Sequence, residues 1–278
     1  MRWVVRHRTA YHYGGAAQDS YNEVRLKPVS NQEQELESFE LTVQPAAAVE
    51  HYVDCYGNWV DHFEVFEPHT FLEMRTRAVV ATHPAAPLPE DARSAPLAAI
   101  GEAAQNERCF DFIEASHFTD TEPETRRLAL EATEGQTDVW QAALAIMRFV
   151  HRHLEYEPRS THVHTRMREA LAQRRGVCQD FAHVMIGLSR SLQIPARYVS
   201  GYLATERASA THAWVEVFVP SAGWRGLDPT HHCQPDETYV KIAVGRDYND
   251  VPPVRGTYRG TLSRRMEVEV EINSAGER

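Results

Sequence analysis

The sequence predicts an α+β protein in which a strand-rich N-terminal region precedes a second region of mixed helices and strands. Three observations support this fold class. Apolar residues alternate with a period of two through roughly the first eighty residues, which is typical of half-buried strands. A stretch rich in Pro and Ala, residues 82–98, then interrupts the pattern. Beyond it, apolar residues recur at helical spacing.

The N-terminal region contains several candidate strands. Alternate positions from Trp3 to Tyr13 form one face of a long strand, and the pattern recurs at Val24–Leu26, Phe39–Val43 and Phe71–Ala81. The turn residues 56–58 lie between two alternating runs and predict a hairpin. Short strands separated by turns favour an antiparallel β-sandwich, so we predict a β-rich domain with its linker at residues 1–98.

The second predicted domain covers residues 99–278. Apolar spacing predicts helices over Glu122–Ala132 and Thr137–Leu154, the latter capped by Thr137 or Asp138, and a helix that follows Cys178 and ends before Pro195. The alternating segments are residues 196–203, 211–219 and 224–228, with a final strand in the C-terminal segment 261–278.

Composition and charge exclude several classes of protein. The chain has 278 residues, of which 42% are hydrophobic and 24% charged, as in soluble globular proteins. Its formal net charge of −10 repels phosphate backbones and anionic lipid, so we expect neither a nucleic-acid nor a membrane partner. Apolar runs are shorter than the ~18 residues of a transmembrane helix, and the N-terminal segment lacks an apolar stretch of signal-peptide length.

Cysteine usage predicts a reduced, cytoplasmic protein. The four cysteines, Cys55, Cys109, Cys178 and Cys233, lie far apart and form no CxxC motif. Four cysteines in so long a chain are not a disulfide framework. We therefore expect free thiols, with Cys55 and Cys109 in structural roles. The sequence does not indicate an oligomeric state.

Cys178 is the candidate nucleophile. It lies where a glycine-containing turn meets a predicted helix, and two arginines precede it. A helix N-terminus carries about half a positive charge and unpaired N–H groups, which favour a thiolate and can stabilise an oxyanion. Taken alone, Cys178 could equally be an inert buried thiol, because free cysteines are often buried.

His212 and Asp228 are the candidate partners of Cys178. His212 opens an alternating strand, and Asp228 ends the next one. If the two strands pair across the turn near Gly223, these side chains become neighbours. An acid beside a catalytic histidine orients its ring and stabilises the imidazolium.

Three blocks of sequence resemble the core of bacterial transglutaminase-like proteins over about Gln141 to Gly260. They are RRGVCQDFAHVMIGLSRSLQIPARYVSGYL, THAWVEVFVPSAGWRGLDPT and VGRDYNDVPPVRGTYRG. The resemblance implies a papain-like core in which a helix presents the nucleophile against an antiparallel sheet that carries His and Asp. It assigns these roles to Cys178, His212 and Asp228. The strand-rich N-terminal part resembles the small β domain that precedes this core in relatives.

The resemblance also implies acyl transfer at an amide bond of a peptide or protein. Cys178 forms a thioester, which water hydrolyses or an amine captures, so the enzyme is expected to be a cysteine peptidase or a transglutaminase-like acyltransferase. We favour hydrolysis, because nothing in the chain specifies an amine acceptor site. No HExxH or DxDxDG motif occurs, so we expect no metal and no cofactor.

Other residues near the triad have less certain roles. Tyr156 matches a position close to the active site of relatives, and Gln179 follows the nucleophile in a possible oxyanion region. Trp214 is either core or pocket wall. Glu216 on the same strand face needs a partner if it is buried, and Asp180 is expected to bond the first helical turn.

Two other functions remain open. The fold could bind a peptide or carrier without turnover, although an intact triad argues against this. The same triad and acyl chemistry also occur in amidases that remove glycans from asparagine side chains, but no feature of the sequence indicates sugar recognition.

Overall fold

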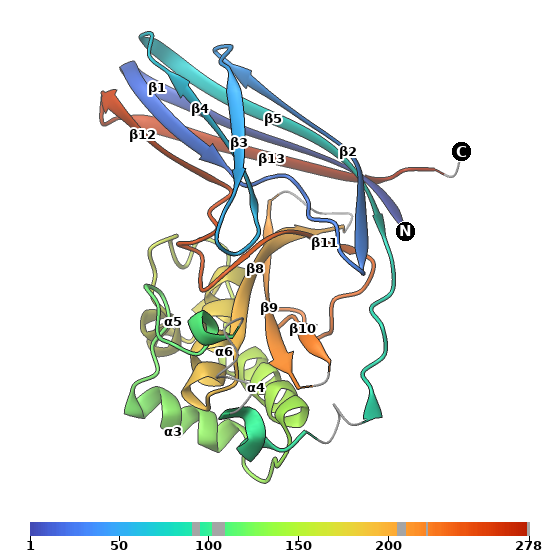
Figure 1. Ribbon diagram of the computed structural model, residues 1–278. Helices are drawn as coiled ribbons and strands as arrows, with labels where there is room; N and C mark the ends of the chain where they lie inside the picture. Colours follow the sequence, from blue (N-terminus) through green and yellow to red (C-terminus); the bar gives the residue numbers. More distant parts are fainter. Residues whose placement is uncertain (91–94, 102–108, 205–209, 221, 277–278) are drawn as a thin grey trace.

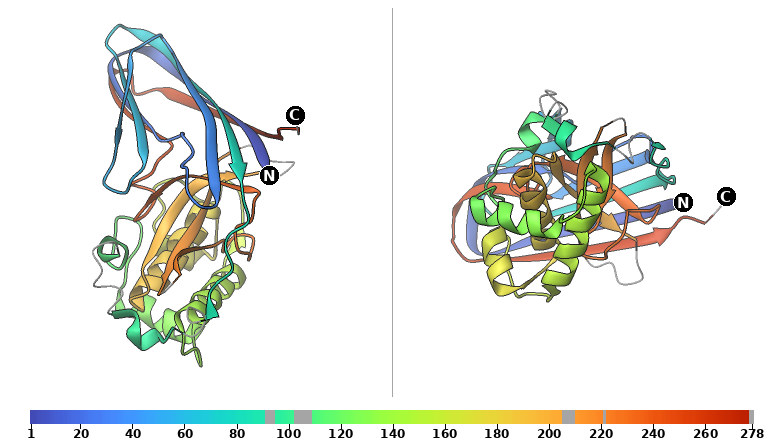
Figure 2. Two further views of the ribbon diagram at one scale, coloured as in Figure 1. Left: turned by 45° about the vertical axis from the view of Figure 1, so that its right-hand side comes forward. Right: turned by 90° about the horizontal axis from the view of Figure 1, so that it is seen from below.

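The computed structural model describes residues 1–90, 95–101, 109–204, 210–220 and 222–276. They form a large antiparallel sheet of long strands and a body of helices packed around a second, smaller sheet (Figure 1). Both chain ends lie beside the large sheet, whereas the helices gather at the opposite end of the molecule (Figure 2). The predicted α+β class is confirmed. Within the described ranges, no helix combines the length and the apolarity that crossing a membrane requires.

The large sheet is built around strand β1 (Arg2–Val24), which continues well beyond the predicted end at Tyr13. Strand β5 (His69–Thr82) pairs with the first part of β1, and β4 (Trp59–Val65) pairs with the last part. Strand β2 (Gln34–Gln44) lies against β5, and β3 (Val49–Val53) forms the predicted hairpin with β4.

The other side of β1 is covered by the end of the chain. Strand β12 (Val254–Gly260) pairs with the last part of β1, and β13 (Arg264–Ser274) pairs with the first part. The sequence-based division placed the C-terminal segment 261–278 with the catalytic core, but β13 is a strand of the N-terminal sheet. Alternation predicts a strand and its buried face, but not the strand whose N–H and C=O groups it will satisfy.

The large sheet has a hydrophobic core of its own. Buried residues from both parts of β1, from the segment just after it and from β4 and β5 form one cluster, namely Tyr11, Tyr13, Ala17, Val24, Leu26, Phe63, Val65, Leu72 and Met74. Hydrogen bonds join β1, β4, β5, β12 and β13 in a single sheet. The predicted antiparallel β-rich region is confirmed.

The second sheet has four antiparallel strands in the order β10-β9-β8-β11. They are β8 (Ala196–Leu203), β9 (His212–Val219), β10 (Gly223–Leu227) and β11 (Tyr239–Gly245). Helix α6 (Cys178–Ser191) packs on one face of this sheet. The predicted strands correspond to β8, β9 and β10, whereas β11 was not anticipated.

Three further helices surround α6. They are α3 (Pro123–Ala132), α4 (Val139–His153) and the short α5 (Met167–Gln173), and each packs against α6. Asp138 caps α4 by accepting a 2.8 Å hydrogen bond from the backbone N–H of Gln141. Helices α3 and α4 match the prediction. Part of the predicted linker, residues 91–94, lies outside the described residues.

A second buried cluster joins the large sheet to the helical body. Val5, Ala78, Val80 and Val270 of the large sheet belong to the same buried cluster as the interior residues of α4, α6 and the second sheet. Two 3-10 helices, Leu97–Ala99 and Phe110–Phe112, lie in the connection between them. The N-terminal sheet is therefore packed against the helical body rather than joined to it by a linker alone.

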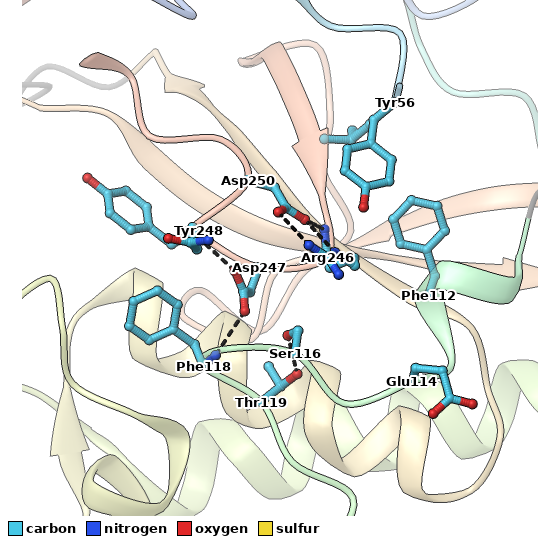
Figure 3. Close-up of polar contacts among 12 residues, drawn as sticks. Tyr56, Phe112, Glu114, Ser116, Phe118, Thr119, Arg246, Asp247, Tyr248 and Asp250 are labelled. Atoms are coloured by element: carbon cyan, nitrogen blue, oxygen red, sulfur yellow. Dashed lines mark hydrogen bonds and ion pairs between the residues drawn. The ribbon is translucent and has the colours of Figure 1, made fainter. Parts of the chain in front are cut away.

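Arg190, on α6, is completely buried and anchors the connecting loop. Its guanidinium donates hydrogen bonds to the carbonyl oxygens of Phe112, Glu114, Ala196 and Arg246 and to the hydroxyls of Ser116 and Thr119. Figure 3 shows how the loop that carries Ser116 and Phe118 faces the turn that carries Arg246 and Asp247. Burial lowers the pKa of Arg190 to about 10, so the side chain remains charged at neutral pH.

We expect Arg190→Lys to lower the free energy of unfolding by about 3 kcal/mol. An ammonium group lacks the planar fork of donors, so several buried carbonyl oxygens would lose their partners. Urea unfolding followed by circular dichroism measures the change. Arg127→Lys is the matched control, because Arg127 is exposed on α3 and should leave the midpoint unchanged. An unchanged midpoint for Arg190→Lys would contradict the anchoring role.

Candidate active site

Cys178 is the first residue of α6, and the turn before it is held by Asp180. The Asp180 carboxylate accepts hydrogen bonds from the backbone N–H of Val177 at 2.8 Å and from the hydroxyl of Thr161 at 2.6 Å. A Cβ atom on Gly176 would lie 2.6 Å from this carboxylate, so only glycine fits there. These contacts place the Cys178 side chain at the N-terminus of a buried helix, as predicted.

His212 and Asp228 are neighbours, as the hairpin prediction requires. Strands β9 and β10 pair antiparallel, with Leu227 opposite Val215, and this register brings the start of β9 to the end of β10. His212 Nε2 lies 2.7 Å from Asp228 Oδ2. This hydrogen bond leaves Nδ1 as the ring nitrogen for the Cys178 sulfur.

Asp228 has no exposed surface, and its carboxylate accepts five hydrogen bonds. Oδ2 is shared by His212 Nε2 at 2.7 Å, His231 Nδ1 at 2.8 Å and the Tyr239 hydroxyl at 2.8 Å. Oδ1 accepts from the backbone N–H groups of Thr230 and His231 at 2.7 and 3.1 Å. Burial acts to raise the pKa of Asp228, but the bonds and charges of the two histidines hold it well below its usual range.

The charge on Asp228 and the proximity of Cys178 favour protonated His212. Burial lowers the pKa of His212, but hydrogen bonds to Asp228 and Cys178 and their negative charges outweigh it and raise the pKa to about 9. The His212 side chain is 10% exposed, so a small part of it reaches the surface. The arrangement can therefore hold an imidazolium beside the sulfur at neutral pH.

Tyr156 lies close to the nucleophile, as the resemblance implied. It belongs to β6 (Glu155–Tyr156), which pairs with β7 (Arg175–Gly176), and this pairing puts Tyr156 opposite Gly176. Burial and the charge of Cys178 raise the pKa of Tyr156, whose side chain nevertheless remains exposed. The hydroxyl is thus a protonated donor near Cys178 at neutral pH.

Gln179 and Trp214 have supporting positions. The Gln179 side-chain amide donates to the carbonyl oxygen of Val163 at 3.1 Å and so ties the preceding loop to α6. Trp214 is 2% exposed, and its ring stacks on His212 and packs edge-on against Tyr239. Trp214 therefore belongs to the core and holds the His212 ring from the side.

Glu216 is buried on the same face of β9 and is fully paired. Arg197 approaches its carboxylate at 2.6 Å, and Lys241 forms a second ion pair. Burial acts to raise the pKa of Glu216, but Lys241 and Arg197 lower it to about 2. Glu216 and Lys241 line a cavity of about 170 Å³, together with Trp214.

His231 and Tyr239 were not identified from the sequence. His231 lies three residues after Asp228, in a turn to which the sequence patterns assign no role. The nitrogen and oxygen atoms of His212, Asp228 and His231 do lie within 4.8 Å of one another. Their N–O separations of 2.7 and 2.8 Å are hydrogen-bond lengths, whereas ligands of a tetrahedral zinc ion lie about 3.3 Å apart.

Comparisons with known proteins identify the family. A model of the transglutaminase-like superfamily matches residues 126–229, and a model of the bacterial transglutaminase-like N-terminal region matches residues 4–81. An uncharacterized protein of Mycobacterium leprae is 33% identical over 98% of both chains. An uncharacterized protein of Mycobacterium tuberculosis is 32% identical over 98% of this chain and 92% of its own length. The chain belongs to the transglutaminase-like superfamily.

Two further relatives are similar in fold or in part of the sequence. The structure of a candidate cysteine protease from Cytophaga hutchinsonii matches with a TM-score of 0.83 and 23% identity over 100% of this chain and 92% of that one. A protein-glutamine gamma-glutamyltransferase of Pseudomonas aeruginosa is 33% identical over 50% of this chain but only 23% of its own. The similarity to the Cytophaga hutchinsonii structure confirms the papain-like fold of the core.

We expect Gly201→Ala to lower both the stability and the reactivity of Cys178. A Cβ on Gly201 would lie 2.3 Å from the carbonyl oxygen of Val240 and 2.4 Å from the Trp214 ring. Because this ring supports His212, relief of the clash would displace the base, at a cost of about 1–3 kcal/mol in unfolding free energy. Thermal unfolding and iodoacetamide labelling measure the two effects.

The matched control is Gly276→Ala, since a Cβ there meets no atom within 4 Å. It should behave as the parent protein in both assays. Undisturbed labelling of Cys178 in a destabilised Gly201→Ala protein would show that Trp214 does not position His212.

Proposed function

We propose that this protein is a cysteine amide hydrolase that acts on peptides or proteins through a thioester at Cys178. One observation carries the proposal: the hydrogen-bonded pair of His212 and Asp228 lies beside a cysteine at the N-terminus of a buried helix. A nucleophile, a base within hydrogen-bond reach and a third group that orients the base are the requirements of this chemistry. The intact set argues against a role in binding alone.

The reaction begins with attack of the Cys178 sulfur on the carbonyl carbon of the amide. The carbonyl oxygen becomes an oxyanion, for which the backbone N–H groups at the start of α6 and the Tyr156 hydroxyl are the nearest candidate donors. The C–N bond then breaks, and the departing nitrogen takes a proton from His212. An acyl group remains on sulfur as a thioester, and a free amine leaves.

Water completes the cycle. Neutral His212 accepts a proton from the water as its oxygen attacks the thioester carbon, and the C–S bond breaks to release a carboxylic acid and regenerate the Cys178 thiolate beside the imidazolium. Asp228 stays ionised throughout, because its five donors stabilise the carboxylate. Its part is to hold the ring and to stabilise its positive charge.

Transamidation is the second candidate outcome of the same acyl-enzyme. The Pseudomonas aeruginosa relative is a protein-glutamine gamma-glutamyltransferase, which favours a glutamine side chain as acyl donor. A primary amine would then take the place of water. We favour hydrolysis, because the buried carboxylate of Glu216 is already paired with Lys241 and Arg197. Glu216 is therefore poorly placed to attract a positively charged amine.

Mass spectrometry of glutamine-containing peptides distinguishes these outcomes. We expect peptide cleavage or loss of ammonia with water incorporation, and no amine incorporation when a primary amine is added. Cys178→Ala should abolish every product, because no thioester can form. Equal turnover by Cys178→Ala would refute the proposal, and amine incorporation would assign the transferase activity instead.

At neutral pH, we expect iodoacetamide to label Cys178 at least about ten times faster than Cys55. Cys55 is the exposed cysteine, so accessibility alone would favour the opposite order. Labelling followed by peptide mapping measures both rates in one sample. His212→Ala should reduce the Cys178 rate towards that of Cys55, whereas equal rates in the parent protein would remove the basis for an activated nucleophile.

We expect amide hydrolysis to fall as the pH rises through about 9. The pKa of His212 is raised from its ordinary value of 6.5 to about 9. The ring therefore keeps its second proton at neutral pH and loses it only as the pH passes about 9. A neutral ring cannot protonate the departing amine. A rate that rises through pH 6.5 and remains high beyond pH 9 would show instead that neutral His212 starts the reaction.

A further inference from the structure

Asp228 Oδ2 is shared by two histidines in different surroundings. The rings of His212 and His231 have centroids 5.1 Å apart and approach the same oxygen. The His212 side chain is 10% exposed, whereas that of His231 is 48% exposed. A half-exposed histidine that bonds the orienting carboxylate lies between the solvent and the triad.

His231 binds both oxygens of the carboxylate. Its backbone N–H donates to Oδ1 of Asp228, and its Nδ1 bonds Oδ2. The turn that carries it is closed by backbone bonds between Asp228 and Cys233 in both directions. The next residue, His232, points elsewhere and stacks on His151 of α4. Only one histidine of the adjacent pair therefore acts on Asp228.

We propose that His231 is a positioning residue of this active site, which fixes the Asp228 carboxylate and shares its negative charge with His212. The proposal rests on the triad described above. Each hydrogen bond to Oδ2 withdraws part of the charge that holds the proton on His212. If the carboxylate were bonded to His212 alone, His212 would hold its proton more firmly. Proton transfer from His212 to the departing amine would then be slower.

Other described groups that face this pair lie on α6, β11, α4 and the same turn, where the Cys233 thiol contacts the Tyr239 hydroxyl at 3.3 Å. Cys178 approaches His212 from α6, and Tyr239 of β11 donates to the same Asp228 oxygen. His151 of α4 contacts the turn through the Pro229 carbonyl oxygen. The negative charges of Cys178 and Asp228 favour the imidazolium form of His212. Tyr239 and His231 donate hydrogen bonds to Asp228 and so weaken its effect on His212.

The rate of Cys178 alkylation by iodoacetamide, measured against pH in the full chain, tests the proposal without a substrate. Its upper inflection reports loss of the His212 proton. We expect His231→Ala to move that inflection upward by about 0.5 pH unit or more, since a donor to a charged acceptor is lost. His231→Gln should move the inflection likewise. The glutamine amide reaches the position of Nε2 rather than that of Nδ1, so it does not replace the donor to Asp228.

Two variants serve as controls. His231→Asn places an amide donor near the position of Nδ1 and should return the inflection to that of the parent protein. His232→Asn changes the same residue type on the same turn without touching Asp228, at a positive φ that asparagine tolerates. It should leave the inflection in place. Thermal unfolding of each variant reports any loss of fold separately.

The results separate the two proposals. If Cys178 reacts faster than Cys55 but the inflection does not move in His231→Ala or His231→Gln, the positioning role is wrong and the proposed function stands. An equal shift in His232→Asn would also overturn it, since the turn as a whole would be responsible. If Cys178 of the parent protein is no more reactive than Cys55, the proposed function fails first.

Discussion

The burial of helix α6 is the constraint on which the rest of this structure depends. Almost every side chain from Gln179 to Ser191 is buried, because the second sheet covers one side of the helix and α3, α4 and α5 cover the others. Such a helix cannot rotate or slide without opening its core. Asp180 holds its first turn and Arg190 its last, so the position of Cys178 is set by packing rather than by a flexible loop.

The buried charge of Asp228 imposes a second constraint. A carboxylate without exposed surface is stable only if donors replace the lost water, and here they come from β9, from β11 and from the turn after β10. The same donors that stabilise the ion also position it. The charge that Asp228 presents to His212 therefore depends on several groups at this end of the second sheet. The half-exposed His231 is one of these groups.

Much of the fold follows from local patterns. Helices α3, α4 and α6 have strong apolar spacing, and α4 has Asp138 as its cap. Helix α5 was missed because it has only seven residues. β1 was predicted to end at Tyr13, but the strand continues through Gly14 and Gly15. The residues before and after these glycines pair with β13 and β12 on one side and with β5 and β4 on the other, which outweighs the low strand propensity of glycine.

The sequence by itself predicted the candidate nucleophile and its two candidate partners, since the helix start at Cys178, the alternation of β9 and the blocks of family resemblance are local signals. Only the tertiary structure decided that β12 and β13 complete the N-terminal sheet, and that His231 and Tyr239 share the carboxylate of Asp228. Strand partners and the donors to a buried charge depend on where distant segments meet. No periodicity along the chain encodes which segments meet in the folded protein.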